Sequence, residues 1–464
     1  MKNGKNGTNG MNGKGGANGA EAEAFDLVGV GFGPSNLAIA TLLASESPAA
    51  WRDKRVVFLD RKPRFGWHSN MLLDDTRMQI CFLKDLITLK SPTSPYTFVN
   101  FLKVHGRLND FLNLQTFYPS RHEFHQYLEW VAGELGRFVR YGAEVASVRP
   151  AAGPGERVEA LEVRYRDLGS GAERTLRARN LVIAPGGAPR LPPGVETDEV
   201  VFHSAHFLER IERFAARAEH PYRFLVVGAG QSAAEIFRHL ARAFPRADVT
   251  QAIRRFALAQ VDGNPLANAI FDEDMVEFFF GLPESLRASC LRELAGTNYS
   301  VVDDDLIADI YRLLYDQKVG GVDRCRIRRF VDFERCRRDG DGVVVELRDL
   351  AAGRVEAGRY DAVVLATGYQ SAADGLLAGL GPHLARRDGG GPVVRRDYSV
   401  EAARPAHFRP KIFLQGASTE ATHGLTSTLI SLLPIRAEEI LTSAFGAPAQ
   451  PLAPEAPRDR NQTS

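Results

Sequence analysis

A glycine-rich turn near the N-terminus has the residue types and the spacing that can hold a phosphate. It follows the apolar run FDLVGV, opens a segment with helical spacing of apolar residues, and runs Gly31-Phe32-Gly33-Pro34-Ser35-Asn36. Gly31 permits a tight turn, and Gly33 lets the backbone approach a pyrophosphate at the positive end of the helix. Asn36 stands where a glycine is usual. The pattern predicts a dinucleotide site, and the alternative is a glycine turn in an unrelated α/β fold.

A second turn of the same kind lies in the middle of the chain and runs Gly228-Ala229-Gly230-Gln231-Ser232-Ala233. It joins an apolar strand to a helix, and the small Ala233 allows close helix packing. The strand that follows the first turn ends in Asp60, whose carboxylate can bind the hydroxyls of a ribose. Arg254 and Arg255 end the strand that follows the second turn. This pair favours a 2′-phosphate, hence NADPH over NADH, and the alternative is two solvated arginines.

Two nucleotide folds in one chain indicate a flavoprotein in which NADPH reduces a bound FAD, because a dehydrogenase needs only one such fold. A later strand and turn contain Thr367 and Gly368, which we interpret as the return of the flavin fold and as candidate flavin contacts. A disulfide acceptor for the flavin would need neighbouring cysteines, and the chain has four distant ones: Cys81, Cys290, Cys325 and Cys336. Oxygen or a quinone remains, and we favour oxygen because the sequence has no apolar run that could span a bilayer.

The composition is that of an ordinary globular protein and excludes several other classes. The chain has 464 residues, 44% of them hydrophobic and 25% charged, and its formal net charge is +1. This balance gives no electrostatic reason to expect a nucleic acid or a membrane surface as a partner. The Gly- and Asn-rich N-terminus has no apolar region of a secretory signal, and we expect the cysteines to be reduced. A cytoplasmic protein is therefore predicted.

The order of these elements predicts the fold class and the domains. We expect an α/β protein with two Rossmann-like dinucleotide-binding domains, for FAD and NADPH, and a small helical substrate region. Apolar residues at three-and-four spacing in DMVEFFF and DDDLIADIYRLLYDQ indicate the helical region. The expected divisions are a disordered tail at 1–24, a first FAD-binding part at 25–211, an NADPH-binding domain at 212–357 with the helical region at about 265–323, a second FAD-binding part at 358–446, and a disordered tail at 447–464.

Ordered blocks of residues along most of the chain resemble a known family, the N-hydroxylating flavoprotein monooxygenases that hydroxylate ornithine or lysine for hydroxamate siderophores. Within the family, the pattern is most similar to the ornithine hydroxylases. The blocks are GFGPSNLA at 31–38, Trp67-His68, MQICFLKDLITLKSPTSPYTFVNFL at 78–102, YPSRHEFHQYLEW at 118–130, GAGQSAAEIF at 228–237, NPLANAIFDED at 264–274, TNYSVVDDDLI at 297–307, ATGY at 366–369 and THGLTSTLIS at 422–431.

The resemblance implies a cofactor arrangement and a reaction. FAD would sit across the first fold near Trp67, His68 and Gln79, and Leu425 is a further candidate contact. NADP⁺ would stay bound after reducing the flavin, and O₂ would form a C4a-hydroperoxyflavin whose distal oxygen is attacked by the neutral amine of the substrate. The chemistry agrees, because such a peroxide must be kept away from water and a retained nucleotide can shield it. FAD and NADPH are therefore the expected cofactors.

The resemblance also implies the residues that bind the substrate. Lys84 in FLKDL would pair with an α-carboxylate, and Asn268 and Asn298 would hydrogen-bond the α-amino and carboxylate groups. Ser427, or Thr426 beside it, would lie close to both flavin and substrate. An amino acid held by both charges leaves its terminal amine at a fixed distance from the flavin, so the cavity length would select L-ornithine over L-lysine.

Other interpretations of the same residues stay open. Outside the family, Lys84 is typical of a solvated charge, and the two asparagines are typical of cap or turn residues. His68 is equally typical of a structural histidine. The alternative functions are N-hydroxylation of L-lysine or of a diamine, although a diamine has no carboxylate for Lys84. A Baeyer–Villiger type monooxygenase is disfavoured because only His203 matches its usual block, and a non-catalytic redox sensor is disfavoured because nothing that the chemistry needs is missing.

Two further expectations concern metals and assembly. His122 and His125 lie three residues apart on a predicted helix without a third ligand, so we expect no metal. The resemblance implies a homotetramer, because relatives are commonly tetramers.

Overall fold

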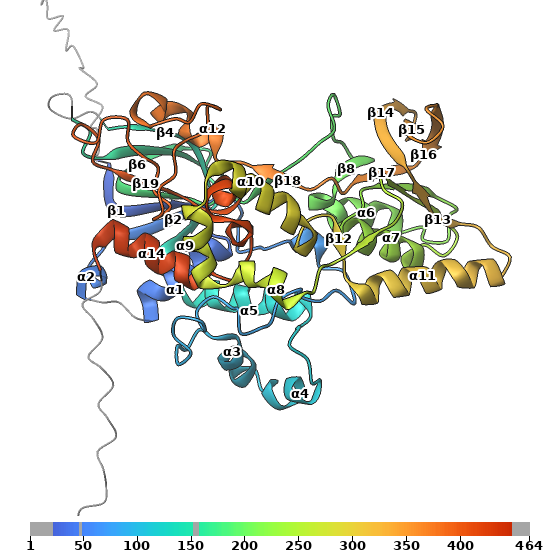
Figure 1. Ribbon diagram of the computed structural model, residues 1–464, viewed down its shortest axis with the longest axis horizontal. Helices are drawn as coiled ribbons and strands as arrows, with labels where there is room; N and C mark the ends of the chain where they lie inside the picture. The colour runs from blue at the N-terminus through green and yellow to red at the C-terminus, as the bar shows by residue number, and fades with distance from the viewer. Residues whose placement is uncertain (1–21, 46–48, 152–156, 448–464) are drawn as a thin grey trace, which may run out of the picture.

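The computed structural model forms two lobes side by side, with the first glycine turn in the left lobe of Figure 1 and the second in the right. It describes residues 22–45, 49–151 and 157–447. The expected tails at 1–24 and 447–464 lie almost wholly outside the described residues. The first tail ends earlier than predicted, because the opening strand begins at Glu23, whose carboxylate pairs with Arg55 at 3.1 Å and with Arg140 at 2.6 Å.

The first sheet is built around the first glycine turn. Its strands follow the order β3, β2, β1, β6, β5 and β4, and β19 adds to β6. Their bounds are β1 (Glu23–Val30), β2 (Val56–Asp60), β3 (Val139–Tyr141), β4 (Ala143–Pro150), β5 (Leu161–Asp167), β6 (Glu173–Ile183) and β19 (Lys411–Leu414). β3, β2, β1, β6 and β19 run parallel, whereas β5 and β4 extend the sheet in antiparallel pairs. This is the Rossmann-like order predicted for the first nucleotide fold.

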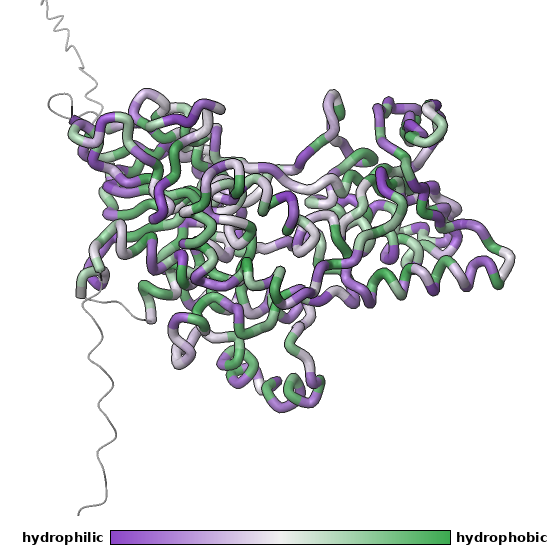
Figure 2. The backbone as a smooth tube through the Cα atoms, in the orientation of Figure 1, coloured by the Kyte–Doolittle hydropathy of each residue, from purple (hydrophilic) through white to green (hydrophobic). Residues whose placement is uncertain are grey.

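Hydrophobic side chains cover both faces of this sheet, and hydrophobic stretches run through both lobes in Figure 2. The helices of the first lobe are α1 (Pro34–Ser45), α2 (Ala49–Arg52), α3 (Phe98–Val104), α4 (Leu108–Asn113), α5 (Arg121–Glu134), α12 (Asp374–Leu377), α13 (Glu420–His423) and α14 (Leu433–Phe445). Leu27 and Phe58 of the strands pack with residues of α1, α5 and α14 on one face. Val28 and Leu59 point to the opposite face and pack with β4, β5 and α12. The first nucleotide fold thus has a core on each side of its sheet.

The second sheet surrounds the second glycine turn and has the order β13, β10, β9, β17 and β8, with all its strands parallel. Its strands and the adjoining helices are β8 (Val201–His203), α6 (Phe207–Ala215), β9 (Arg223–Val227), α7 (Gln231–Ala243), β10 (Asp248–Ile253), β13 (Cys325–Arg329) and β17 (Ala362–Leu365). Parallel strands are buried on both faces, and the apolar runs of β9 and β17 satisfy that requirement.

The strand pairing differs from the expected domain boundaries. The sequence interpretation gave 25–211 and 358–446 to the FAD-binding domain and 212–357 to the NADPH-binding domain. However, β17 pairs in parallel with both β9 and β8, and its residues are buried in the core of the second lobe. Both β8 and β17 therefore belong to the second nucleotide fold, and β17, directly before the ATGY segment, completes the second sheet instead of the flavin fold.

A narrow link joins the two lobes. β7 (Gly187–Pro189) and β18 (Tyr369–Ser371) pair antiparallel, so the chain enters the second lobe and leaves it through neighbouring strands (Figure 1). These two paired strands of the link thus support each other.

The segment predicted to be helical, at about 265–323, contacts both lobes. It contains α8 (Pro265–Asn268), η4 (Ala269–Phe271), α9 (Glu273–Gly281), α10 (Glu284–Glu293), η5 (Leu294–Thr297), β12 (Val301–Val302) and α11 (Asp304–Val319). α11 alternates hydrophobic and hydrophilic residues in Figure 2, and its buried Leu306 and Ile310 pack in the core of the second lobe beside α7. α9 and α10 pack against α13 of the first lobe. The helical segment therefore lies between the two nucleotide folds.

A small antiparallel sheet was not predicted. It is formed by β14 (Val331–Asp339), β15 (Gly342–Asp349) and β16 (Val355–Tyr360), and Val343, Val345 and Leu347 attach it to the core of the second lobe. A further short strand, β11 (Ala259–Gln260), pairs with β12. Within the described ranges, no helix has the length and apolar character required to cross a bilayer.

Candidate functional site

The first glycine turn has the geometry that a phosphate site needs. Gly31 has a φ of 84°, and a Cβ there would lie 2.3 Å from the carbonyl oxygen of Ala184, so only glycine fits. A Cβ on Gly33 would meet nothing within 4 Å, which leaves room for a ligand beside the backbone. Pro34 and Ser35 begin α1, and because proline has no N–H, the backbone N–H groups that favour an anion there start at Ser35.

Asn36 shapes this turn from inside the protein. Its amide nitrogen donates to the carbonyl oxygens of Val30 at 3.2 Å and Gly31 at 2.7 Å, and its side-chain oxygen accepts from Gln415 at 3.0 Å. These bonds explain why an asparagine stands at the usual glycine position. Because the side chain is fully buried, the prediction that it contacts FAD is corrected to a role in supporting the turn.

Asp60 lies at the carboxyl end of β2, next to the same turn. One carboxylate oxygen accepts from the backbone N–H of Phe32 at 2.7 Å, and the other accepts from that of Lys62 at 2.8 Å. The buried side chain is therefore part of the turn. A carboxylate oxygen can accept more than one hydrogen bond, so Asp60 can hold the turn and a ribose together.

The second glycine turn repeats the first in outline. Gly228 has a φ of 141°, and a Cβ there would lie 2.3 Å from the carbonyl oxygen of Ala366. Gly230 precedes α7, and a Cβ on it would lie 3.4 Å from the Cα of Ser300. Ser232 is half-buried in the first turn of α7. The loop that carries Asn298 thus lies against the second turn.

Arg254 and Arg255 directly follow β10, at the position that corresponds to Asp60 in the first fold. The Arg254 side chain is 75% exposed, and its ion pair with Asp332 is 4.0 Å long. Arg255 donates to the carbonyl oxygen of Ser300 at 3.1 Å. Both guanidinium groups are exposed at the end of the strand, where a 2′-phosphate is expected.

Three segments that carry candidate substrate residues come together. η4, which follows Asn268, packs against η8 (Leu425–Thr428), and α8, which ends in Asn268, packs against η5, which precedes Asn298. Tyr299, beside Asn298, contacts the Thr428 hydroxyl at 3.1 Å. The Asn268 amide donates to the carbonyl oxygen of Asp262 at 3.3 Å, which orients the side chain within its loop.

Lys84 lies in a loop that is fixed by its neighbour Asp85. The buried Asp85 carboxylate accepts hydrogen bonds from the backbone N–H groups of Ile87, Thr88 and Phe98 and from the Thr88 hydroxyl. Burial raises the pKa of Asp85, and these bonds oppose the increase. Among the described residues, no ion pair involves Lys84 and no hydrogen bond joins it to Asn268 or Asn298. Its ammonium group is therefore available to an anion.

Ser427 and Thr426 lie buried in η8, together with Leu425. The buried guanidinium of Arg436, from α14, donates to the carbonyl oxygens of Ser427 at 2.9 Å and Thr426 at 2.7 Å. The Ser427 hydroxyl is buried and has no hydrogen-bond partner in the part of the chain that the structure describes. Because an unpaired buried hydroxyl is costly, a bound ligand that pairs with it is favoured.

Trp67 and His68 lie where the first lobe meets the link. The ring of His68 is 4.9 Å from that of Trp67 and 6.4 Å from that of Tyr369 in β18. Desolvation, helped by the positive charges of Arg121 and Lys62, lowers the pKa of His68, although the residue is exposed at the surface. The imidazole is therefore neutral near pH 7.

Thr367 and Gly368, predicted as flavin contacts, follow β17 and hold the link between the lobes. The Gly368 carbonyl oxygen accepts from the backbone N–H of Arg190 at 2.9 Å and lies 2.9 Å from Nε2 of His203. The Thr367 hydroxyl donates to the Arg190 carbonyl oxygen. The structure thus places both residues in the second fold and gives them structural partners.

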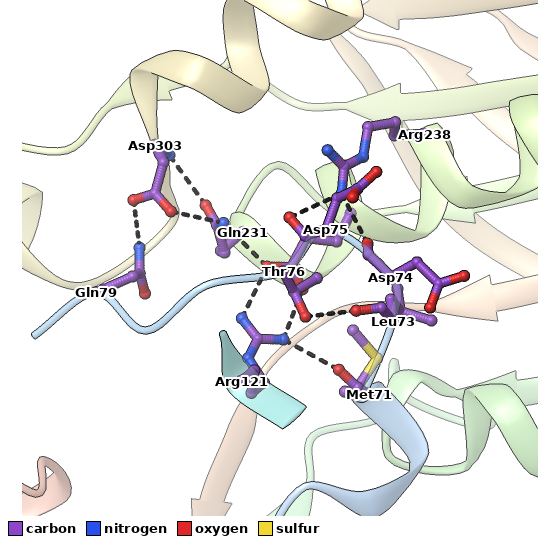
Figure 3. A network of polar contacts seen from close by, with 11 residues as sticks. Met71, Leu73, Asp74, Asp75, Thr76, Gln79, Arg121, Gln231, Arg238 and Asp303 are labelled. Atoms are coloured by element: carbon purple, nitrogen blue, oxygen red, sulfur yellow. Dashed lines mark hydrogen bonds and ion pairs between the residues drawn. The ribbon is translucent and has the colours of Figure 1, made fainter. Parts of the chain in front are cut away.

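Helix α7 presents a row of polar side chains to the first lobe, which we call the α7 seam: Gln231, Glu235, Arg238 and Arg242. Buried Glu235 accepts two hydrogen bonds from Arg121 of α5, both of 2.8 Å. At the N-terminal end of α7, the carboxylate of Asp303 accepts from the amides of Gln79 at 2.8 Å and Gln231 at 2.9 Å (Figure 3). Gln79 and Gln231, predicted to serve different cofactors, therefore meet on one carboxylate.

Comparison with known proteins identifies the family. Residues 23–371 match the family model described as L-lysine 6-monooxygenase/L-ornithine 5-monooxygenase. This chain belongs to that family. An L-ornithine N(5)-monooxygenase of Burkholderia cepacia is 44% identical over 405 residues, which cover 86% of this chain and 90% of the relative.

Solved structures of the family have the same fold along almost their whole length. The ornithine hydroxylase of Pseudomonas aeruginosa is 40% identical with a TM-score of 0.84, and the match covers 91% of this chain and 99% of the other. The ornithine N-hydroxylase of Kutzneria sp. 744, solved with reduced FAD, NADP⁺ and L-ornithine, is 39% identical with a TM-score of 0.85 and the same coverage.

Three residues of the site were missed from the sequence. Asp303 stands at the start of the acidic run DDDLI, where a helical pattern begins. This signal could have marked it only as a helix cap. Arg436 stands in LPIRAEEIL, where a charge among apolar residues is a weak signal. Glu235 lies among small and apolar residues of α7, and its burial depends on the distant Arg121. In the described residues, no group of three or more His, Cys, Asp or Glu side chains is arranged to hold a metal.

Proposed function

We propose that this chain hydroxylates the side-chain amine of L-ornithine to give N5-hydroxyornithine, with FAD, NADPH and O₂. The observation that carries the proposal is the similarity to ornithine hydroxylases along the full fold, with 44% identity to one relative and TM-scores of 0.84 and 0.85 to two solved structures. The candidate residues agree with this reaction, because two amides and a buried hydroxyl lie on neighbouring segments, and Lys84 presents a cation from a loop held by Asp85.

The residues of the first fold fit an FAD molecule. Gly33 offers open space for a pyrophosphate, Asp60 keeps acceptor capacity for a ribose, and the Ser427 hydroxyl lacks a protein partner among the described residues. Bound FAD supplies the two-electron chemistry that activates O₂. The protein binds and orients the substrate and excludes water from the reaction.

The residues of the second fold fit NADPH. The open end of α7 offers N–H groups for the pyrophosphate, and the exposed Arg254 and Arg255 offer charge to a 2′-phosphate. The Gln231 side chain is already bonded to Asp303 and Glu235, so at this position the backbone is the available donor.

Lys84 is proposed to bind the α-carboxylate of ornithine. Its ammonium group is half-buried on a loop held by Asp85, so the charge is presented from a fixed backbone. Asn268 and Asn298 are proposed to bind the α-amino and carboxylate groups. With the α-amino and α-carboxylate groups both held, the terminal amine of the side chain lies at a fixed distance from the flavin.

The product assay tests the function directly. Purified, FAD-loaded enzyme is incubated with NADPH, O₂ and L-ornithine, L-lysine, putrescine or aspartate, and hydroxylamine product is measured in place of NADPH loss. We expect hydroxylamine from ornithine at a rate well above that from the other amines. If ornithine accelerates NADPH consumption but yields only hydrogen peroxide, while lysine is hydroxylated, the substrate assignment is wrong.

Replacing Lys84 tests the binding mode. We expect Lys84→Ala to raise the KM for ornithine by about 10- to 100-fold, because a charge-assisted hydrogen bond contributes about 1.5–3 kcal/mol. The rate of anaerobic flavin reduction by NADPH should stay within about twofold of wild type, since this step needs no substrate contact. Lys318→Ala, on the exposed face of α11, is the matched control. Slow flavin reduction with a normal KM would remove Lys84 from the substrate site.

We also propose that the enzyme works as a homotetramer in the cytoplasm and supplies hydroxamate siderophore or related biosynthesis. Tyr311, Tyr315 and Val319 support an assembly surface, because they are spaced by four residues on α11 and exposed. Light scattering on purified protein measures the mass, and a monomer at micromolar concentration would contradict the tetramer.

A further inference from the structure

Asp303 is the residue on which the two expected cofactor sites converge (Figure 3). One carboxylate oxygen accepts from Gln79 at 2.8 Å, and the other accepts from Gln231 at 2.9 Å. The backbone N–H of Asp303 also donates to the Gln231 side-chain oxygen at 3.0 Å. Gln79 belongs to the first lobe, and Gln231 opens α7 beside the second glycine turn. A single side chain therefore joins the two sides of the site.

Asp303 determines the orientation of both glutamine amides. An ionised carboxylate can only accept hydrogen bonds, so each glutamine must turn its nitrogen toward Asp303. For Gln79, this choice leaves the carbonyl oxygen to accept a bond from another neighbour. Gln231 is held more completely, because its nitrogen also donates to Glu235 at 3.0 Å and its oxygen accepts from Asp303.

The position of Asp303 in its own helix shows that the carboxylate serves a distant partner. Asp303 is the N-cap of α11, yet its side chain makes no capping bond. An aspartate at this position ordinarily accepts from a backbone N–H in the first helical turn. Burial raises the pKa of Asp303, and the bonds from the two glutamines oppose the increase. The side chain thus bridges the lobes at the expense of a local role.

The substrate side of the site is attached to the same point. Asn298 precedes Asp303 by five residues, and between them Ser300 lies against Gly230 of the second turn. A displacement of Asp303 would therefore move the Gln79 amide, the second glycine turn and the loop of Asn298 relative to one another.

We propose that Asp303 is a positioning residue for N-hydroxylation. By fixing the amide of Gln79 and the start of α7, it holds the flavin side and the nucleotide side of the site in register. NADPH oxidation is then coupled to hydroxylamine formation, and less of the reduced flavin is lost through reduction of O₂ to hydrogen peroxide. This inference rests on the proposed function and adds to it a residue that couples its two halves.

Two isosteric variants separate positioning from general stability. Asp303→Asn replaces one acceptor oxygen with a donor nitrogen, so one glutamine must turn or lose its bond. Asp309→Asn is the matched control, because Asp309 lies further along the α7 seam and pairs there with Arg238 at 3.4 Å and Arg242 at 2.7 Å. Each FAD-loaded variant is assayed with ornithine for hydroxylamine formed per NADPH consumed, for hydrogen peroxide, and for the midpoint of thermal unfolding.

We expect Asp303→Asn to lower the yield of hydroxylamine per NADPH by about threefold or more, with hydrogen peroxide making up the difference, because small displacements in a reactive geometry are costly. Asp309→Asn should keep the wild-type yield, even if its midpoint of thermal unfolding falls as far as that of Asp303→Asn. A wild-type yield in Asp303→Asn, or an equal fall in both variants, would overturn the proposal, since either result assigns Asp303 a purely structural role.

A double-mutant cycle shows whether Asp303 acts through Gln79. Gln79→Ala, Asp303→Ala and the double variant are compared for the same yield. If Asp303 acts in part by orienting the Gln79 amide, the loss of yield in the double variant should be smaller than the product of the two single losses. Two independent losses that multiply would contradict this mode of action.

NADP⁺ binding tests Asp303 without turnover. Titration of the oxidised holoenzyme with NADP⁺, followed by the change in flavin absorbance, should give a Kd about tenfold higher in Asp303→Asn and unchanged in Asp309→Asn. If the wild type forms no hydroxylamine from any amine, the proposed function fails. The NADP⁺ titration still tests whether Asp303 positions the nucleotide side of the site. A wild-type Kd in Asp303→Asn would remove it from the nucleotide side of the site.

Discussion

The two nucleotide folds share a turn and differ in the residue at the carboxyl end of their second strand. Gly31 and Gly228 both have positive φ, and a Cβ on either would lie 2.3 Å from a carbonyl oxygen. In the first fold, buried Asp60 is bonded to the turn itself, whereas in the second fold Arg254 is largely exposed. Asp60, proposed to bind ribose hydroxyls, is therefore also part of the fold, because two backbone N–H groups donate to its carboxylate without a ligand. Arg254, proposed to meet a phosphate, is held by a 4.0 Å ion pair with Asp332 and stays at the surface.

Replacing the turn glycines would break the two folds separately and should have the largest effect. We expect Gly31→Ala to abolish FAD retention and Gly228→Ala to abolish flavin reduction by NADPH while FAD stays bound. The left-handed conformation alone costs about 1–2 kcal/mol for a residue with a Cβ, and the clash with a backbone oxygen adds to this. Flavin absorbance of the purified variants and anaerobic reduction kinetics measure both effects. Gly133→Ala, in α5, is the control, because a Cβ there would meet nothing within 4 Å and the residue lies outside both turns.

Replacing the acid sharpens the comparison, because Asp60 is expected to serve fold and ligand together. Asp60→Asn keeps only one acceptor oxygen, so one of the two backbone N–H groups, of Phe32 or Lys62, loses its partner. An unsatisfied buried donor costs about 1–3 kcal/mol. We expect a lower unfolding midpoint in the FAD-free protein and a Kd for FAD raised by about tenfold. A weaker Kd with an unchanged midpoint would show that the acid serves the ligand alone.

Replacing the arginine should affect the ligand only. We expect Arg254→Ala to reduce the preference for NADPH over NADH by about tenfold, which corresponds to about 1.4 kcal/mol, and to leave the unfolding midpoint unchanged. Arg337→Ala, on the exposed side of β14, is the matched control. The preference is measured as the ratio of kcat/KM for the two nucleotides. An unchanged ratio would place the phosphate contacts elsewhere.

The smallest expected effect concerns pH and the link between the folds. Desolvation lowers the pKa of His203 to about 4, compared with about 6.5 when unfolded. Its Nδ1 accepts from the Ala205 N–H at 3.1 Å, which requires the neutral ring. Because the unfolded chain binds the proton more tightly, this contribution to stability is present above pH 6.5 and is lost as the pH falls toward 4. We expect His203→Gln to flatten the dependence of the unfolding midpoint over this range. If the midpoint of His203→Gln depends on pH as steeply as that of the wild type, the pH dependence arises from other groups, such as His423.

The sequence predicts the parts of this molecule that depend on neighbours along the chain. Each glycine turn, with its strand, helix and terminal residue, lies within a short stretch, so the spacing alone reveals it. The sheet to which β17 belongs is decided by pairing with β8 and β9, far earlier in the chain, and the local pattern of a buried strand is the same in either sheet. The domain boundaries therefore differed from the prediction.

The candidate site divides in the same way. Lys84, Asn268 and Asn298 came from family resemblance, because lysine and asparagine are common on any surface. The sequence pattern around Asp303 could mark only a helix cap, and the folded chain is needed to show that its carboxylate bonds to side chains from two other segments. Residues whose role is to connect lobes carry no local pattern, since their partners are chosen by tertiary structure.

The position of β19 has a consequence for synthesis on the ribosome. The first sheet begins at Glu23 but receives β19 only at Lys411, after every strand of the second sheet has been made. Phe413 of β19 packs on one face of the first sheet, and Ile412 and Leu414 pack on the other. Neither core of the first lobe is therefore complete until β19 has been synthesised. The lobe that starts first is therefore completed last, and a chain truncated before β19 can finish only its second nucleotide fold.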